Sequence, residues 1–259
     1  MIGTDLITIR FQAAADVDIG AKRSNNEDEV VFCPEYGFFA VSDGMGGLEA
    51  GGETSAMIAK LLPKLIRENV EALETVPSPL LAAKILGEQI ELISKKITEN
   101  IDEARVESFG ATLCCLWLID RHAVFANLGD SRAYVFDRAN NYLRQVTNDH
   151  NLAGMMVKYG MLSRKEVSRH PASSSLTKYV GMREQSAPDV FIEKLDLQSG
   201  ILLCSDGLHG MLSDSTLTKC LSSQKDPTHV VRKLIDKANI AGGRDNISVV
   251  YVKITSPYE

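Results

Sequence analysis

The sequence predicts an α+β protein in which antiparallel β-sheets are covered by long helices. Short apolar runs typical of strands recur along the chain, and short turns separate several of them. Two consecutive stretches between residues 54 and 101 carry apolar residues at helical spacing. The chain has 259 residues, 44% of them hydrophobic, which is enough for one substantial core. No repeat or linker divides it, so we expect one domain over residues 1–259.

The expected strands begin near the N-terminus, where Ile7, Ile9 and Phe11 alternate with polar residues. The further apolar runs are residues 38–41, 112–119, 123–128, 132–136, 201–204 and 247–254. Residues 137–141 (DRANN) are typical of a hairpin turn leading to another run over 142–146, and residues 119–122 (IDRH) predict a second turn. Strands joined by short turns favour antiparallel sheets.

Three helices are expected between the strands. Residues 54–73 and 80–101 have apolar positions at helical spacing, separated by the breaker VPSP, and Pro63 is expected to kink the first helix. In the second, Leu81, Ile85, Leu86 and the isoleucines that follow should share one face. Residues 226–238 form the third, with Pro227 near its start. The long pair should cover a sheet face.

Residues 148–188 differ from the rest of the chain. They are polar, with short helical pieces and no clear strand. We expect an excursion from the core, a mobile flap near the site, and the element that sets substrate specificity.

Composition excludes several classes of protein. The net charge is -6 and the pI about 5.5, which argues against a nucleic-acid surface. No apolar run approaches the roughly 18 residues of a membrane span, and the N-terminus does not resemble a signal peptide. The five cysteines form no C-x-x-C pair, so buried thiols in the cytoplasm are expected rather than disulfides or a zinc site.

Aspartates recur where the expected strands meet loops. They are Asp43 in VSDG, Asp206 in CSDG, Asp130 in NLGD and Asp245 in GRDN, and Glu27 and Asp28 precede another apolar run. A single Asp-Gly is most often a turn. Several acids at one sheet edge would repel one another unless a cation joined them. Oxygen ligands without paired His or Cys favour Mg²⁺ or Mn²⁺.

The glycine-rich stretch VSDGMGGLEAGGE does not match the familiar phosphate loops. Glu49 stands where the dinucleotide fingerprint requires its third glycine, and Glu53 where a P-loop requires lysine. Its acidic charge requires a cation between the loop and any phosphate. One aspartate can bridge two ions that activate a shared water.

Arg23 is the candidate phosphate-binding residue. Its planar guanidinium can bind two phosphate oxygens, and it lies close to Glu27 and Asp28 in sequence. Alone it would be read as a surface charge. The five histidines are expected to cap, turn or lie at the surface. The chain has no G-x-S-x-G and no cysteine in a phosphatase context.

Six motifs in order resemble the compact bacterial form of the metal-dependent PPM, or PP2C, Ser/Thr protein phosphatases. They are GAKRSNNEDEV, VSDGMGGLEAGGETSA, SFGATLCCLWL with ANLGDSRAYVF, the flap stretch beginning VTNDHNLAGMM, LLCSDGLHGMLSD, and GGRDNISVVYV. They extend over about 240 residues. The resemblance implies a four-layer α-β-β-α sandwich, two packed antiparallel sheets flanked by helix pairs.

The resemblance also implies an activity and a site. A binuclear Mn²⁺/Mg²⁺ centre with a metal-bridging hydroxide would hydrolyse phosphoserine and phosphothreonine in one step, and Arg23 would bind the phosphate. Asp43 would bridge the metals, Asp206 and Asp245 would complete one site, and the Gly44 carbonyl would serve the other. Glu27 or Asp28 would bind through water, and Asp130 would hold a third, weaker metal. We expect phosphorylated proteins as partners, either substrates of a Ser/Thr kinase or the kinase itself, and a monomer.

The glycine-rich loop departs from the family pattern. Met45 stands where animal members carry a histidine, and Leu48 where bacterial relatives usually do. The leaving-group acid is therefore unassigned, with a metal-bound water as the provisional choice. Two alternatives stay open: a catalytically weak phosphoprotein-binding regulator on the same fold, and a hydrolase of small phosphate esters.

Overall fold

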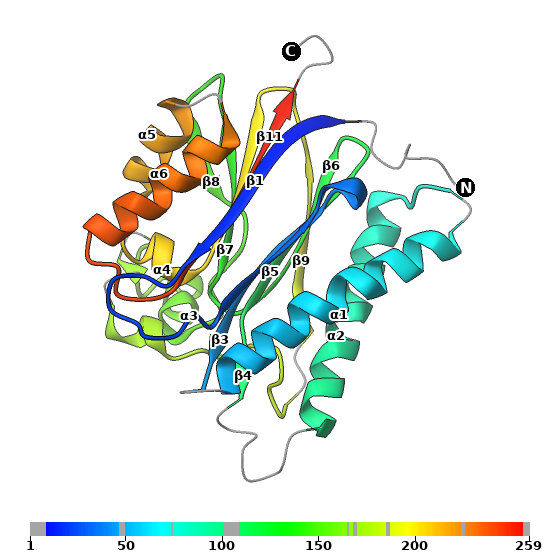
Figure 1. Ribbon diagram of the computed structural model, residues 1–259, viewed down its shortest axis with the longest axis horizontal. Helices are drawn as coiled ribbons and strands as arrows, with labels where there is room; N and C mark the ends of the chain where they lie inside the picture. Colours follow the sequence, from blue (N-terminus) through cyan, green and yellow to red (C-terminus); the bar gives the residue numbers. More distant parts are fainter. Residues whose placement is uncertain are drawn as a thin grey trace.

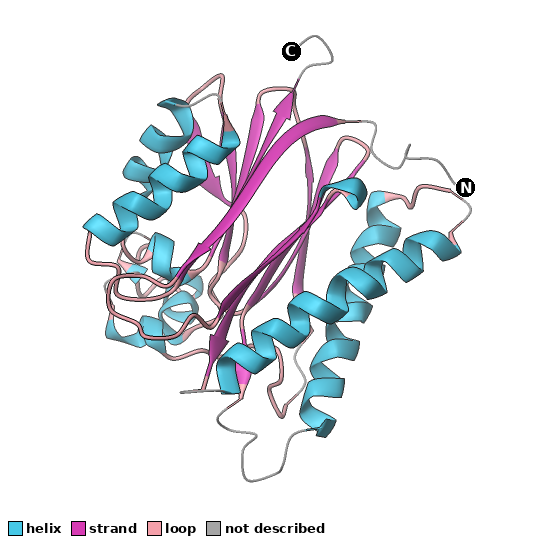
Figure 2. Ribbon diagram, viewed as in Figure 1, coloured by secondary structure: helices cyan, strands magenta, loops and turns pink. Residues whose placement is uncertain are grey.

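The computed structural model shows four layers, with helices on the outer faces of two packed sheets (Figures 1 and 2). It describes residues 9–46, 50–73, 75–100, 109–164, 166–167, 170–184, 187–223 and 226–255. The α+β sandwich expected from the sequence is confirmed.

Both sheets are antiparallel throughout. One has the order β1 (Arg10–Asp18), β11 (Ile247–Thr255), β10 (Ser199–Cys204), β7 (Arg132–Asp137) and β8 (Tyr142–Gln145). The other has the order β2 (Asp28–Cys33), β3 (Phe38–Met45), β5 (Leu113–Ile119), β6 (His122–Leu128) and β9 (Asp189–Lys194), and β4 (Gly110–Ala111) pairs with β3.

The hairpins predicted at residues 119–122 and 137–141 are both present. Ile119 pairs with His122, and Asp120 takes a positive φ of 50° in the tight turn. Asp137 pairs with Tyr142. The strand β9 was missed, because its sequence DVFIEK is half polar and follows the flap directly. It is an edge strand whose residues are all partly or fully exposed, so its sequence needs fewer apolar residues than that of a buried strand.

Each sheet is covered by its own helices, and the paired long helices lie where they were expected. α1 (Ala50–Ala72) and α2 (Pro79–Asn100) pack on the six-stranded sheet. α5 (Asp214–Ser223) and α6 (Pro227–Ile240) cover the other, and Asp226 caps α6 by accepting a hydrogen bond from the Thr228 amide. α5 was not predicted. Within the described part of the chain, every helix lacks the combination of length and hydrophobicity that crossing a bilayer requires.

Three apolar clusters hold the layers together. The outer two lie between each sheet and its helices, and the central one lies between the sheets. Ile58, Leu62 and Ile66 recur every four residues on α1 and are fully buried. On α2 the buried face is centred on Leu86 and Ile90, whereas Leu81 is 38% exposed, so its placement on that face was wrong. The helix α1 continues through Pro63.

The segment 148–188 contains short helices and no long strand among its described residues, as predicted. These helices are α3 (Leu152–Lys158) and η4 (Pro171–Ser174), and a further 3-10 turn, η1 (Pro34–Tyr36), precedes β3. Two isolated bridges, Asn151 with Leu176 and Ala111 with Val180, hold this segment, hereafter the flap, to itself and to the core. Its expected mobility remains a prediction.

The central cluster generates a first prediction. Phe125 on β6 has no exposed surface and lies between the two sheets. Phe125→Ala should lower the free energy of unfolding by about 3–5 kcal/mol, because it removes apolar burial and leaves a cavity. Chemical denaturation would measure this. Tyr142→Ala, at a side chain 60% exposed on β8, is the control and should change it by less than about 0.5 kcal/mol. A smaller loss at Phe125 than at Tyr142 would contradict the packing.

Candidate active site

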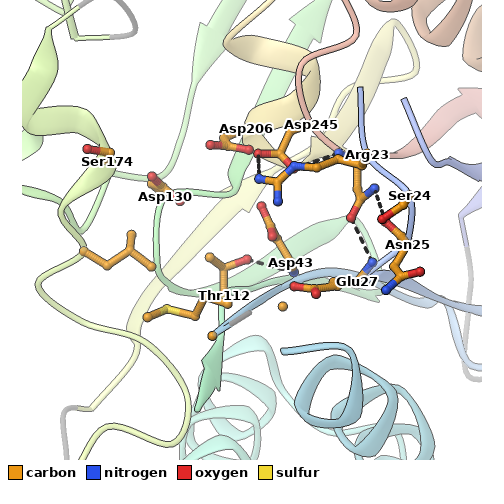
Figure 3. A pocket seen from close by; sticks show the side chains of 15 residues that line it. Arg23, Ser24, Asn25, Glu27, Asp43, Thr112, Asp130, Ser174, Asp206 and Asp245 are labelled. Atoms are coloured by element: carbon orange, nitrogen blue, oxygen red, sulfur yellow. Dashed lines mark hydrogen bonds and ion pairs between the residues drawn. The ribbon is translucent and has the colours of Figure 1, made fainter. Parts of the chain in front are cut away.

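A cavity of about 540 Å³ opens at one end of the sandwich and gathers most of the predicted site residues (Figure 3). The predicted residues that line it are Arg23, Glu27, Asp43, Gly44, Asp130, Asp206 and Asp245. They come from both sheets and from the loops between their strands. Asp28 is the exception, because it lies beneath the cavity with 3% of its surface exposed.

Asp43 and Asp28 are placed by strand register. They are directly opposite each other on β3 and β2. Asp43 therefore lies within a strand, and the expectation that it marks the strand end was wrong: β3 continues to Met45 and pairs there with β4. The Asp43 amide donates to Thr112 Oγ1 at 3.1 Å, which fixes the backbone at the cavity floor.

The glycine after Asp43 permits a close backbone crossing. A Cβ on Gly44 would lie 2.3 Å from the carbonyl oxygen of Gly51, at the start of α1. The Gly44 amide donates to the Glu27 carbonyl oxygen at 3.1 Å. The glycine-rich stretch thus lets α1 begin directly against β3. Leu48 and Glu49 lie outside the described residues.

Asp206 and Asp245 lie next to the ends of two neighbouring strands of the other sheet, β10 and β11. Asp206 is the first residue of α4 (Asp206–His209), which follows β10, and Asp245 precedes β11 by two residues. Gly207 is required here, because a Cβ on it would lie 1.8 Å from the Asn246 carbonyl oxygen. Figure 3 shows both carboxyl groups on the same side of the cavity as the Arg23 guanidinium.

Asp130 connects the cavity to the flap. It lies between β6 and β7, and its Oδ2 accepts a hydrogen bond from Asn151 Nδ2 at 3.1 Å. The Oδ1 atom of Asn151 accepts from the Gly154 amide and caps α3. One side chain therefore joins the flap helix to a cavity acid, and the sequence analysis did not single it out.

Asn246 is a second residue that the sequence analysis missed. Its Nδ2 donates to the carbonyl oxygens of Ile19 at 2.8 Å and Asn25 at 2.9 Å, and its Oδ1 accepts from the Glu27 amide at 2.8 Å. These three bonds hold the loop that carries Arg23. The only signal in the sequence was its place beside Asp245, since bonds across more than 200 residues leave no local pattern.

Arg23 is half exposed and lines the cavity together with the acids. Its Nη2 donates to Asp245 Oδ2 at 2.8 Å, with 51% of the arginine side chain exposed. Hydrogen bonding to Asp245 raises the arginine pKa, and the charges of Glu27 and Asp43 add to it. A guanidinium beside a polar cavity is suited to bind a phosphate oxyanion.

Four aspartates at the cavity have raised pKa values: Asp28, Asp43, Asp130 and Asp206. Desolvation raises the pKa of Asp28 to about 7, of Asp206 to about 6 and of Asp130 to about 8, and neighbouring carboxylates contribute to each rise. The pKa of Asp43 is raised by desolvation and then by the charge of Asp28 and three further aspartates. This accumulation of negative charge is typical of a cation site.

The donor set fits a hard divalent cation. Its ligand atoms are oxygens, and Asp28 Oδ1 and Asp206 Oδ1 are inaccessible to solvent and accept no hydrogen bond. Among the described residues, however, no three acidic, His or Cys side chains are already arranged around one point to hold an ion. Asp245 is directed to Arg23, and Asp28 Oδ2 accepts from Ser205 Oγ at 2.7 Å. We still favour a cation site. The excess negative charge and the two unsatisfied oxygens argue for a cation more strongly than the missing ligand cluster argues against one, because carboxylates repel one another when no cation lies between them.

Two histidines are buried and bond to a turn, which is one of the three expected roles. His209 is buried, its Nε2 lies 2.9 Å from the Asp130 carbonyl oxygen, and burial lowers its pKa to about 3. His150 is buried, and its Nδ1 accepts from the Gly129 amide. Both support the turn that carries Asp130. His170 does cap a helix, η4, as expected.

Comparison with known proteins shows similarity to bacterial protein phosphatases. The protein phosphatase 2C family matches residues 21–235. The serine/threonine phosphatase stp of Listeria welshimeri is 32% identical over 219 residues, 82% of each chain. The S. agalactiae serine/threonine phosphatase has a TM-score of 0.82 and 28% identity, covering 95% of this chain and 100% of that one.

A further solved structure bears on the metal. It is the catalytic domain of the serine threonine protein phosphatase PstP in complex with 2 manganese ions, with a TM-score of 0.78 and 25% identity over 96% of this chain and 100% of that one. The family match covers most of the sequence, and the two relatives align over 82% and 100% of their own length. The chain therefore belongs to the protein phosphatase 2C family.

Proposed function

We propose that the chain is an active protein serine/threonine phosphatase that hydrolyses phosphoserine and phosphothreonine. The observation that carries the proposal is the single cavity in which Asp43, Asp206 and Asp245 meet beside the half-exposed Arg23. The names of the aligned relatives support the same substrate class.

The acids would hold two Mn²⁺ or Mg²⁺ ions. Asp43 would bridge them, Asp206 and Asp245 would complete one site, and the Gly44 carbonyl would serve the other, with Glu27 or Asp28 binding through water. The two manganese ions in the PstP structure support this number. When bound, such ions activate water as a nucleophile and neutralise phosphate charge. Asp130 would contribute to a third, weaker ion.

The protein's own groups orient the substrate. The Arg23 guanidinium would bind two phosphoryl oxygens, and the bonds from Asn246 hold its loop against the acids. Thr112 and Ser205 fix Asp43 and Asp28 from below. No histidine is among the described side chains that line the cavity, so protonation of the leaving serine or threonine oxygen is not assigned to a side chain.

The expected partners are phosphorylated proteins, which a Ser/Thr kinase would supply, or that kinase itself. All five cysteines lie in the described part of the chain and none forms a disulfide, which agrees with the proposed cytoplasmic location. A hydrolase of small phosphate esters is the remaining alternative, and comparing kcat/KM for a phosphoprotein and a nucleotide would separate the two.

The bridging acid gives the most direct test. Asp43→Asn and Asp206→Asn should each lower Mn²⁺-dependent turnover of a phosphothreonine peptide on the order of 1000-fold, because each removes charge that holds the cations. Phosphate release would be measured with Mn²⁺ and with EDTA. Asp236→Asn, at an exposed acid on α6, is the matched control. Full activity in either site variant, or in EDTA, would exclude the mechanism.

Arg23 should act on substrate binding. Arg23→Ala should raise KM for a phosphopeptide about tenfold to a hundredfold, since a charged hydrogen bond contributes about 1.5–3 kcal/mol. The KM of Arg23→Lys should lie between that of the wild type and that of Arg23→Ala, because lysine keeps the positive charge but lacks the planar guanidinium. Steady-state kinetics would decide, and an unchanged KM in Arg23→Ala would contradict the assignment.

Removal of divalent cations should make stability depend on pH. The folded-state pKa values of Asp28, Asp206 and Asp130, about 7, 6 and 8, lie above the usual carboxyl value near 4. The folded state then binds more protons than the unfolded state between about pH 4 and pH 8, so the free energy of unfolding falls as pH rises.

Thermal melting in EDTA from about pH 5 to pH 8 would measure this effect. The melting temperature should decrease with pH, and excess Mn²⁺ should raise it most at the alkaline end. Asp43→Asn should flatten the profile, because it removes one repelling charge. A profile in EDTA that rises with pH would contradict the raised pKa values.

A further inference from the structure

A second hollow, of about 710 Å³, lies between the flap and the strands β7 and β8. Met155, Lys158 and Tyr159 line it from α3 and its C-cap, and Arg164, Val167 and Met182 line it from the rest of the flap. It shares no lining residue with the catalytic cavity. We call it the flap groove.

Large apolar side chains are exposed along the flap groove. Met155 is 41% exposed and Tyr159, four residues later, is 67% exposed. Leu152 and Met161, close to these two residues in the sequence, are 45% and 70% exposed. Clustered exposed apolar side chains indicate a binding surface, and methionine adapts to varied partners while tyrosine is a common anchor.

The flap groove and the catalytic cavity are lined by consecutive residues of the flap. Ser174 and Leu176 line the cavity, whereas Thr177 and Lys178, the next residues along the chain, line the groove. Asn151 begins α3 and bonds directly to Asp130 in the cavity. A polypeptide whose phosphorylated residue enters the cavity therefore has an apolar surface beside it for its flanking residues.

The charged side chains of the groove favour some bound polypeptide segments over others. Arg132 and Asp149 neutralise each other at 2.6 Å, and Lys178 and Asp189 pair at 3.1 Å. Two further basic residues, Lys158 and Arg164, line the groove, against one further acidic residue, Glu184. Arg164 donates a hydrogen bond to Asn148, whose side chain is neutral, so this bond does not compensate the positive charge of the guanidinium. An acidic residue in the bound segment would be attracted here.

We propose that the flap groove docks a segment of the phosphoprotein substrate that flanks the phosphorylated residue. An apolar side chain of the substrate packs against Met155 and Tyr159, and an acidic neighbour lies near Lys158 and Arg164. The proposal rests on the proposed phosphatase function and adds a sequence preference to it: an apolar residue accompanied by an acidic one.

A comparison of substrates tests the groove separately from the chemistry. The double variant Met155→Ala with Tyr159→Ala would be assayed with Mn²⁺ on p-nitrophenyl phosphate, which is too small to reach the groove. It would also be assayed on phosphothreonine peptides in which a Leu-Glu pair is moved stepwise along either flank. Leu80→Ala, at a side chain 77% exposed on α2, is the matched control.

The wild type should prefer the Leu-Glu pair at particular positions. The double variant should lose that preference through a rise in KM of about tenfold, with kcat and the p-nitrophenyl phosphate constants within about twofold. Lys158→Glu should reduce the preference for glutamate and leave that for leucine. A parallel loss on p-nitrophenyl phosphate, or an unchanged peptide preference, would overturn the proposal.

Direct binding keeps the test independent of turnover. Fluorescence anisotropy of the same peptides should show weaker binding to the double variant than to the wild type or Leu80→Ala. If no Mn²⁺-dependent activity is found, the proposed function fails while anisotropy still decides on the groove. Self-association that the double variant abolishes, with peptide binding unchanged, would instead assign the surface to a second copy of the chain.

Discussion

The repulsion among Asp43, Asp206, Asp130 and their acidic neighbours is the constraint on which the rest of the structure depends. Placing several carboxylates around one cavity costs free energy, which their raised pKa values express. A surface with independent loops would relax by moving the acids apart. Here they are fixed to strand ends and to β3, and the strands are held by three buried apolar clusters. The core of the sandwich thus maintains a charge arrangement that a bound cation or a proton would relieve.

Neutral polar side chains hold the site residues in the positions that the strands give them. Thr112 fixes the Asp43 backbone, Ser205 bonds to Asp28, and Asn246 joins the Arg23 loop to the start of β11. None of them adds charge to the cavity. They hold backbone and carboxyl groups in place, and preorganised groups of this kind spare the reaction the cost of ordering them later.

The flap depends on the same cavity. Asn151 both caps α3 and donates to Asp130, so the position of the flap helix and the environment of that acid are linked through one side chain. His209 and His150 support the adjoining turn from the core as neutral groups, since burial lowers the pKa of each. The flap groove is lined by residues of the same helix, Met155, Val157 and Lys158, and by none of the residues that line the catalytic cavity. Under our proposals, substrate selection and chemistry take place on two separate surfaces.

The sequence alone determined the strands with strong apolar runs, the long helices and the acids Asp43, Asp206 and Asp245, because periodicity and ordered motifs are local properties. Tertiary structure decided the rest. The edge strand β9 lacks a full apolar pattern. The partial exposure of Leu81 depends on how α2 packs on its sheet. Asp43 lies within β3 rather than at its end, because the next two residues pair with β4. Asn246 and Asn151 act on residues distant in the chain. Bonds of that kind arise only when distant segments pack, so no local pattern predicts them.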